Sequence, residues 1–129
     1  MDRTELLLEK YGLEPMREHR DILKEFLGRE SLNEEREDNE YLKTLCILVY
    51  TYGIAEDTLL IWKAKNIDFD TGCYIDGELL IGAGLEETIS YLKTLKTAEA
   101  AKELDYLTNL KTIGRDKVLE FYRSYYGLS

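Results

Sequence analysis

Residues 31–53, SLNEEREDNEYLKTLCILVYTYG, join an acidic run to the most apolar stretch of this 129-residue chain. The apolar residues recur at helical spacing and form two adjoining stripes, Tyr41, Leu45, Leu48 and Tyr52 on one and Leu42, Cys46 and Val49 on the other. So wide an apolar face is typical of a helix that other helices contact on several sides. Ser31 and Glu34 have the spacing of a capping box, which predicts that this central helix begins just after Ser31 and runs to Tyr52.

Shorter helical segments, most of them separated by glycine, are expected on both sides of this stretch. Their predicted ranges are 4–11, about 15–27, 56–66, a short segment from Asp70 or Thr71 to Leu80, 85–95, 97–110 and 115–126. The chain contains one proline and no clear period-two run, so strands are at most minor. We therefore predict an all-α fold, a single helical domain over residues 1–129 that forms a compact array of about seven or eight short helices. Because helix pairs follow one another, an α-solenoid-like arrangement stays open.

The overall charge favours some partners over others. The chain has 26 acidic and 17 basic residues, a net charge of −9, which would repel the phosphate backbone of a nucleic acid. The negative net charge favours a basic protein as the partner. No apolar run approaches the roughly 20 residues of a membrane span, and the first ten residues lack the apolar core of a signal peptide. Cys46 and Cys73 do not form a disulfide framework, so a cytoplasmic location is expected.

The first candidate binding segment is EEREDNE, residues 34–40. Only Arg36 balances its acids, which are Glu34, Glu35, Glu37, Asp38 and Glu40. One interpretation is a solvated first helical turn, where acids also suit the positive end of the helix. The other is a docking surface whose negative field accelerates association with a cationic partner. The regional charge supports the second interpretation, because residues 1–61 hold 15 acids and 8 bases, a net of −7, against −2 for the remainder.

The second candidate segment is NIDFDTGCYIDGELLIGAG, residues 66–84, which resembles a calcium-binding loop only in part. Counted from Asp68, Gly72 and Cys73 occupy the fifth and sixth positions and Leu79 the twelfth, where an EF-hand needs an oxygen ligand, glycine and a bidentate acid. Aspartates that cap helices explain the segment better, and we predict no metal site. Asp68 and Asp70 are expected to contact a partner.

The same segment ends in Gly82 and Gly84, which resemble the start of a dinucleotide-binding fingerprint. Glu87 stands where the third glycine would lie, and the sequence that follows has helical periods only. We therefore predict no cofactor, and we expect the two glycines to allow a tight turn between helices.

Aromatic residues suggest where a partner would be anchored. Ten tyrosines accompany three phenylalanines, and tyrosine suits surfaces that are half apolar and half wet. Trp62 and Tyr74 are the predicted interface anchors, with core packing as the alternative for each. His19 is the only histidine and lies on an apolar helical face, and no Gly-x-Ser-x-Gly motif occurs. The chain is therefore predicted not to be an enzyme.

Residues 57–88, DTLLIWKAKNIDFDTGCYIDGELLIGAGLEET, resemble a stretch found in small uncharacterised bacterial proteins without an established activity. In size, acidity and lack of catalytic groups, the chain is similar to the immunity proteins that bacteria pair with polymorphic or contact-dependent toxins. This resemblance implies a cytoplasmic inhibitor that covers the active site or substrate surface of a toxin domain, often a basic nuclease. Immunity proteins have many unrelated folds, so the resemblance assigns no residue roles.

Two other functions stay open. One is an α-helical scaffold or adaptor that binds peptides or assembles with itself, and the other is an enzyme that uses the 68–78 carboxylates with a divalent metal. The sequence also leaves open whether the 34–40 segment or the 68–78 corner forms the interface.

Overall fold

In the computed structural model, which describes residues 1–128, the chain forms eight α-helices, three short 3-10 helices and no strand. In chain order these are α1 (Arg3–Tyr11), η1 (Arg17–His19), α2 (Arg20–Ser31), α3 (Glu40–Tyr50), η2 (Ala55–Asp57), α4 (Thr58–Lys65), α5 (Phe69–Tyr74), η3 (Gly77–Ile81), α6 (Leu85–Leu95), α7 (Ala98–Leu107) and α8 (Arg115–Tyr125). The all-α prediction is confirmed.

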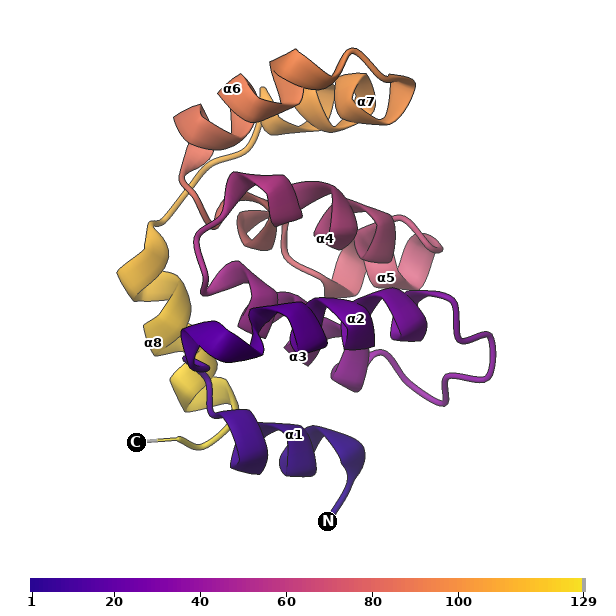
Figure 1. Cartoon of the computed structure of the whole chain (residues 1–129), viewed down its shortest axis with the longest axis vertical. Helices are drawn as coiled ribbons and strands as arrows, with labels where there is room; N and C mark the ends of the chain where they lie inside the picture. The colour runs from indigo at the N-terminus through magenta and orange to yellow at the C-terminus, as the bar shows by residue number, and fades with distance from the viewer. Residues whose placement is uncertain (129) are drawn as a thin grey trace.

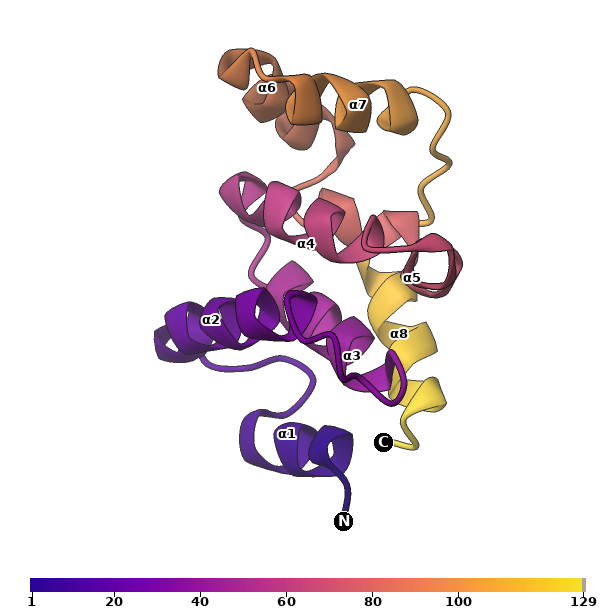
Figure 2. The same cartoon turned by 90° about the vertical axis from the view of Figure 1, so that its right-hand side faces the viewer.

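The helices are stacked in successive layers along the long axis of the molecule (Figures 1 and 2). α1 lies at one end, followed by α2 with α3, then α4 with α5, and finally the α6–α7 pair at the other end. A long connection, residues 108–114, runs back from α7 along one side to α8, which flanks the lower layers. Segments far apart in the sequence therefore meet at the side of the stack.

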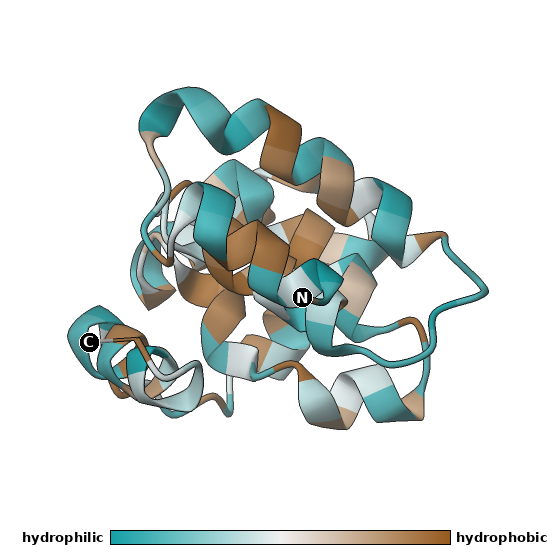
Figure 3. Cartoon of the chain, turned by 90° about the horizontal axis from the view of Figure 1, so that it is seen from below, coloured by the Kyte–Doolittle hydropathy of each residue, from teal (hydrophilic) through white to brown (hydrophobic). Residues whose placement is uncertain are grey.

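α3 is the centre of the core, as its wide apolar face predicts. Residues 42–50 of this helix are all buried, against α2 on one side and α4 and η3 on the other. Hydrophobic residues gather where the helices face one another, and the hydrophilic ones lie toward the outside (Figure 3). The helix stops before Gly53, whose φ of +66° few other residues adopt readily.

The predicted start of the central helix is wrong. Ser31 is the last residue of α2 and donates its hydroxyl to the carbonyl oxygen of Leu27 at 2.8 Å, so it caps no helix start. α3 begins only at Glu40, and residues 32–39 form a loop that extends from the stack (Figure 1). Local side-chain bonds compete with the helix here, because Asn33 accepts from the backbone N–H of Glu35 and Asp38 from that of Glu40.

Other predicted boundaries also differ from the structure, for example the start predicted at about residue 15, where α2 begins only at Arg20 after the short helix η1. α2 continues through Gly28, because burial of Leu27 and Glu30 extends the helix beyond the glycine. The short helix expected from Asp70 or Thr71 to Leu80 is divided into α5 and η3, and Asp68 provides the N-cap. By contrast, α6 covers residues 85–95 as predicted. Thr97 caps α7, which ends at Leu107 instead of the predicted residue 110.

Candidate protein interface

The two candidate segments of the sequence lie side by side in the structure. Asp38 and Asn39, from the loop before α3, share one open hollow of about 500 Å³ with Asp70, Cys73 and Tyr74 of α5. The sequence left open which of the segments forms an interface, and their proximity makes them parts of a single surface. We call Asp38, Glu40, Asp70, Tyr74 and Tyr125 the acidic–aromatic surface.

Hydrogen bonds to Glu40 hold the centre of this surface together. The Tyr74 hydroxyl donates to Glu40 Oε2, and the Tyr125 hydroxyl of α8 donates to the same oxygen at 3.0 Å. The two tyrosine oxygens are 3.2 Å apart. Burial, followed by the hydrogen bond to Glu40, raises the pKa of Tyr74 above its usual value. Both effects keep the phenol protonated, so it continues to donate to the carboxylate.

Lys43 supports the two tyrosine rings from inside the fold. The residue is only 5% exposed, and its Nζ lies 4.0 Å from the ring centroid of Tyr74 and 4.1 Å from that of Tyr125. A cation against aromatic faces is attracted by the ring quadrupole, more strongly where water is excluded. Sequence reasoning missed both Lys43 and Tyr125. Lys43 did leave a signal, since it is the only charged residue within the apolar run 41–52.

The acids of the loop point into solvent, whereas its one base is turned inward. Glu34, Glu35, Glu37 and Asp38 are exposed. The side chain of Arg36 is 11% exposed and donates to the carbonyl oxygen of Asn33 at 2.8 Å and to Asn39 Oδ1 at 3.2 Å. Arg36 therefore shapes the loop, and the outward side of the loop presents only negative charge.

Asp68 and Asp70 differ in what they do. Asp68 is the N-cap of α5: its carboxylate accepts from the backbone N–H of Thr71 at 2.8 Å, and the Thr71 hydroxyl completes a capping box. Its side chain is also 3.9 Å from Arg36. Asp70 is exposed and lines the hollow. Asp70 is thus the acid of this corner that lines the hollow, and Asp68 mainly stabilises the helix.

Trp62 does not belong to the surface. It is 7% exposed and lies between α4 and α7, where its indole N–H donates to Glu99 Oε2 at 3.1 Å and its ring contacts Tyr106. This burial matches the core-packing alternative, and we leave Trp62 out of the interface.

α8 extends the aromatic part of the surface. Phe121 is 56% and Tyr125 46% exposed, and their rings stack at a centroid distance of 6.4 Å. Large exposed aromatic side chains beside carboxylates are typical of interface anchors.

Among residues 1–128, no group of three or more histidine, cysteine, aspartate or glutamate side chains is arranged to hold a metal ion. Within the same residues, every helix is too short or too polar to cross a membrane. Compared with known proteins, the chain matches no family model, no curated protein and no solved structure.

Proposed function

We propose that this chain is a non-catalytic binding protein whose acidic–aromatic surface binds a cationic protein partner. In its most concrete form, the proposal is an immunity-type inhibitor that neutralises a cationic bacterial toxin domain in the cytoplasm. The observation that carries it is the meeting of the two acidic segments around Glu40 and its two tyrosines. Tyrosine anchors surrounded by carboxylates suit the lysines and arginines of a basic surface.

The acids of the loop next to the acidic–aromatic surface support rapid association. With Arg36 turned inward, Glu34, Glu35, Glu37 and Asp38 project an unbalanced negative field. Such a field steers a cationic partner toward the surface and raises the association rate, and salt screens the effect. The hydrogen-bonded tyrosines are already ordered, which reduces the entropy lost on binding.

Calorimetry with a cationic toxin domain, chosen from any that is encoded in a neighbouring gene, tests the proposal. A variant with Glu34→Gln, Glu35→Gln, Glu37→Gln and Asp38→Asn should bind roughly tenfold or more weakly. The control removes four exposed acids elsewhere through Glu56→Gln, Glu86→Gln, Glu87→Gln and Asp105→Asn, with the same change in net charge. A larger loss of affinity in the variant of residues 34–38 than in the control supports the proposal. Equal affinities for both variants would exclude the acids of residues 34–38 from the binding site.

The second candidate function is an α-helical adaptor, favoured by the layered stacking of helix pairs in Figure 2. Repeated helical layers create extended surfaces that bind segments of other chains. The two functions differ in what they recognise. An adaptor should bind a basic segment of the partner as a free peptide about as well as within the folded domain, whereas an inhibitor should require the folded domain.

A further inference from the structure

Glu103 of α7 is completely buried at the contact of the α6–α7 hairpin with the rest of the fold. One carboxyl oxygen, Oε2, is hydrogen-bonded to the hydroxyl of Thr58, the first residue of α4. The other oxygen, Oε1, has no hydrogen-bond partner among the described residues, and the same holds for the buried hydroxyl of Thr88 in α6. A buried carboxylate normally has a cation or several donors around it, so this environment is unusual.

The number of hydrogens at Thr58 decides which form of Glu103 fits. Thr58 Oγ1 lies 2.8 Å from the carbonyl oxygen of Leu80 in η3 and also contacts Glu103 Oε2. A hydroxyl has one hydrogen, so Thr58 cannot donate both to Leu80 and to an ionised Glu103. If Glu103 carries a proton on Oε2, it donates to Thr58, and Thr58 donates to Leu80. Only with Glu103 protonated does each of the two contacts, Glu103 to Thr58 and Thr58 to Leu80, have a hydrogen to share.

Charged groups on the surrounding elements are engaged elsewhere. Lys65 of α4 donates to the carbonyl oxygens of Gly72 and Ile75, and Asp57 of η2 pairs with Arg20 and Lys24. Glu78 of η3 accepts from Thr112 and Ile113, and Glu99 of α7 accepts from Trp62. The remaining charged side chains of η2, α4, α6 and α7 are exposed, namely Glu56, Lys63, Glu86, Glu87, Lys93, Lys102 and Asp105.

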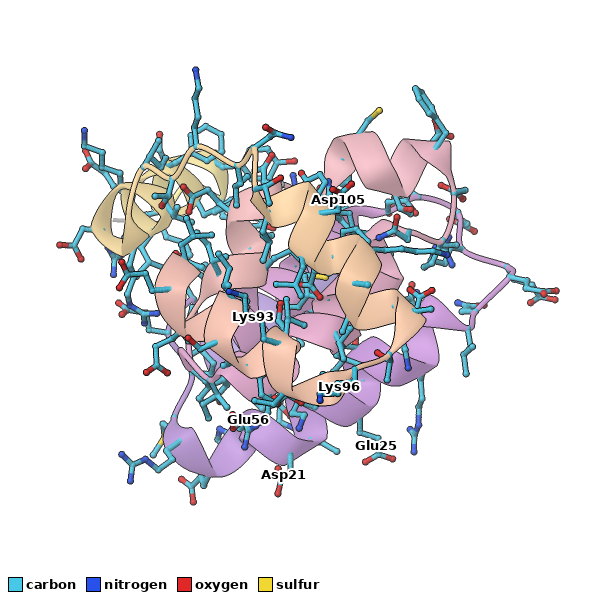
Figure 4. All side chains as sticks on the ribbon, turned by 90° about the horizontal axis from the view of Figure 1, so that it is seen from above. Asp21, Glu25, Glu56, Lys93, Lys96 and Asp105 are labelled. Carbon is cyan, nitrogen blue, oxygen red and sulfur yellow. The ribbon has the colours of Figure 1, made fainter. Side chains whose placement is uncertain are left out.

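Figure 4 looks down on the hairpin and shows Lys93 and Asp105 on its outer side. Burial without a counter-ion raises the pKa of Glu103 to about 7, and the contact with Thr58 offsets only part of this rise.

We propose that Glu103 is a proton-operated latch: its carboxylic acid proton holds the α6–α7 hairpin against α4 and η3, and loss of that proton loosens the hairpin. This device is independent of the acidic–aromatic surface and of the function proposed for it. The docked hairpin binds the proton more tightly than the open hairpin, in which Glu103 is hydrated. Docking is therefore strongest below the ordinary pKa of 4.5, weakens as the pH rises toward about 7, and then levels off.

Trp62 provides a reporter for this motion. It is the only tryptophan, and it lies between α4 and α7 in contact with Glu99 and Tyr106. Opening of the hairpin would expose its indole and shift its emission to longer wavelength. Backbone hydrogen exchange in α6 and α7 reports the same opening independently of the fluorophore.

The test is a titration of the full chain between pH 4.5 and 9. In the wild type, the opening constant of α6 and α7, corrected for intrinsic exchange rates, should rise on the order of a hundredfold over this range. In Glu103→Gln the rise should disappear, because the amide donates to Thr58 as the acid does but carries no titrating proton. Glu99→Gln is the control for direct quenching of Trp62, and it should retain the wild-type titration.

A direct measurement on the wild type keeps the test independent of any variant's folding. The side-chain carboxyl carbon of Glu103, followed by nuclear magnetic resonance, should titrate near pH 7. Titration near pH 4.5, or equal pH dependence of hairpin exchange in the wild type and Glu103→Gln, would overturn the proposal.

Discussion

The hydroxyl of Tyr74 donates to the carboxylate of Glu40, a residue 34 positions earlier in the chain. This bond joins α5 to the first residue of α3, and Tyr125 of α8 binds the same carboxylate oxygen. Three helices thus meet at one charged hydrogen-bond acceptor. Because such bonds are directional, they fix the orientation of both rings at the surface.

We expect Tyr74→Phe to lower the free energy of unfolding by about 1 kcal/mol, because a hydrogen bond to a carboxylate is lost while the ring stays against Lys43. Urea denaturation measures the change. Tyr91→Phe is the matched control, since the hydroxyl of this half-buried tyrosine makes no hydrogen bond with the described residues. Equal stability of the two variants would show that the bond to Glu40 contributes nothing.

Asp57→Asn should destabilise the fold by about 3 kcal/mol, since removing one partner of a buried ion pair leaves the others without their counter-ion. Asp57 is 3% exposed, accepts two hydrogen bonds from Arg20, at 2.9 and 2.7 Å, and lies 3.2 Å from Lys24. The exposed pair of Arg29 with Glu25 provides the comparison, and Glu25→Gln should change stability by less than about 0.5 kcal/mol. Thermal unfolding of both variants tests whether Asp57→Asn lowers the stability more than Glu25→Gln does.

Alanine should have opposite effects at two glycines. A Cβ added at Gly82 would lie 2.5 Å from the carbonyl oxygen of Tyr50, so Gly82→Ala should destabilise by about 1–3 kcal/mol. At Gly28, inside α2, nothing lies within 4 Å, and Gly28→Ala should stabilise by about 0.5–1 kcal/mol. The denaturant midpoints of both variants, compared with that of the wild type, measure these changes in stability. A stabilised Gly82→Ala variant would contradict the close approach of η3 to α3.

The two thiols should differ in reactivity. Cys73 is exposed beside Asp70 and Tyr74, whereas Cys46 is completely buried in α3, and burial raises the pKa of its thiol. We expect a disulfide reagent to modify one thiol per folded chain and two per unfolded chain. The absorbance of the released chromophore measures the number of modified thiols. Rapid modification of both thiols in the folded protein would show that the core around α3 opens readily.

The sequence predicted the helices best where the apolar period or the cap is clear. Leu85–Leu95 has a clear apolar period and forms as expected, and the helix that Thr97 caps also forms, although it ends at Leu107 and not at Leu110. Ser31 misled the prediction, because its spacing to Glu34 imitates a capping box while its hydroxyl bonds backward to Leu27. A local motif cannot reveal that Asn33 and Asp38 hold residues 32–39 in a loop.

The candidate site was predictable in its acids but not in its assembly. Asp38 and Asp70 stood out by their charge, yet only tertiary packing brings them to the same hollow. Trp62 was chosen by residue type, which cannot distinguish an interface anchor from a core residue. Tyr125 was not among the predicted anchors, and its contact with Glu40 depends on the return of α8 along the stack.

That return has a consequence for the order of folding. α1 to α7 pack mainly on neighbours in the sequence, whereas α8 reaches back through Tyr126 to Thr44, 82 residues away, and through Arg123 to Glu14, 109 residues away. Contacts that close such long loops carry the largest entropic cost, so we expect α8 to dock after the transition state. Tyr126→Phe should then accelerate unfolding and leave the refolding rate unchanged in stopped-flow measurements. A partner bound across Tyr74 and Tyr125 would hold α8 in place, and the complex would unfold more slowly than the free chain.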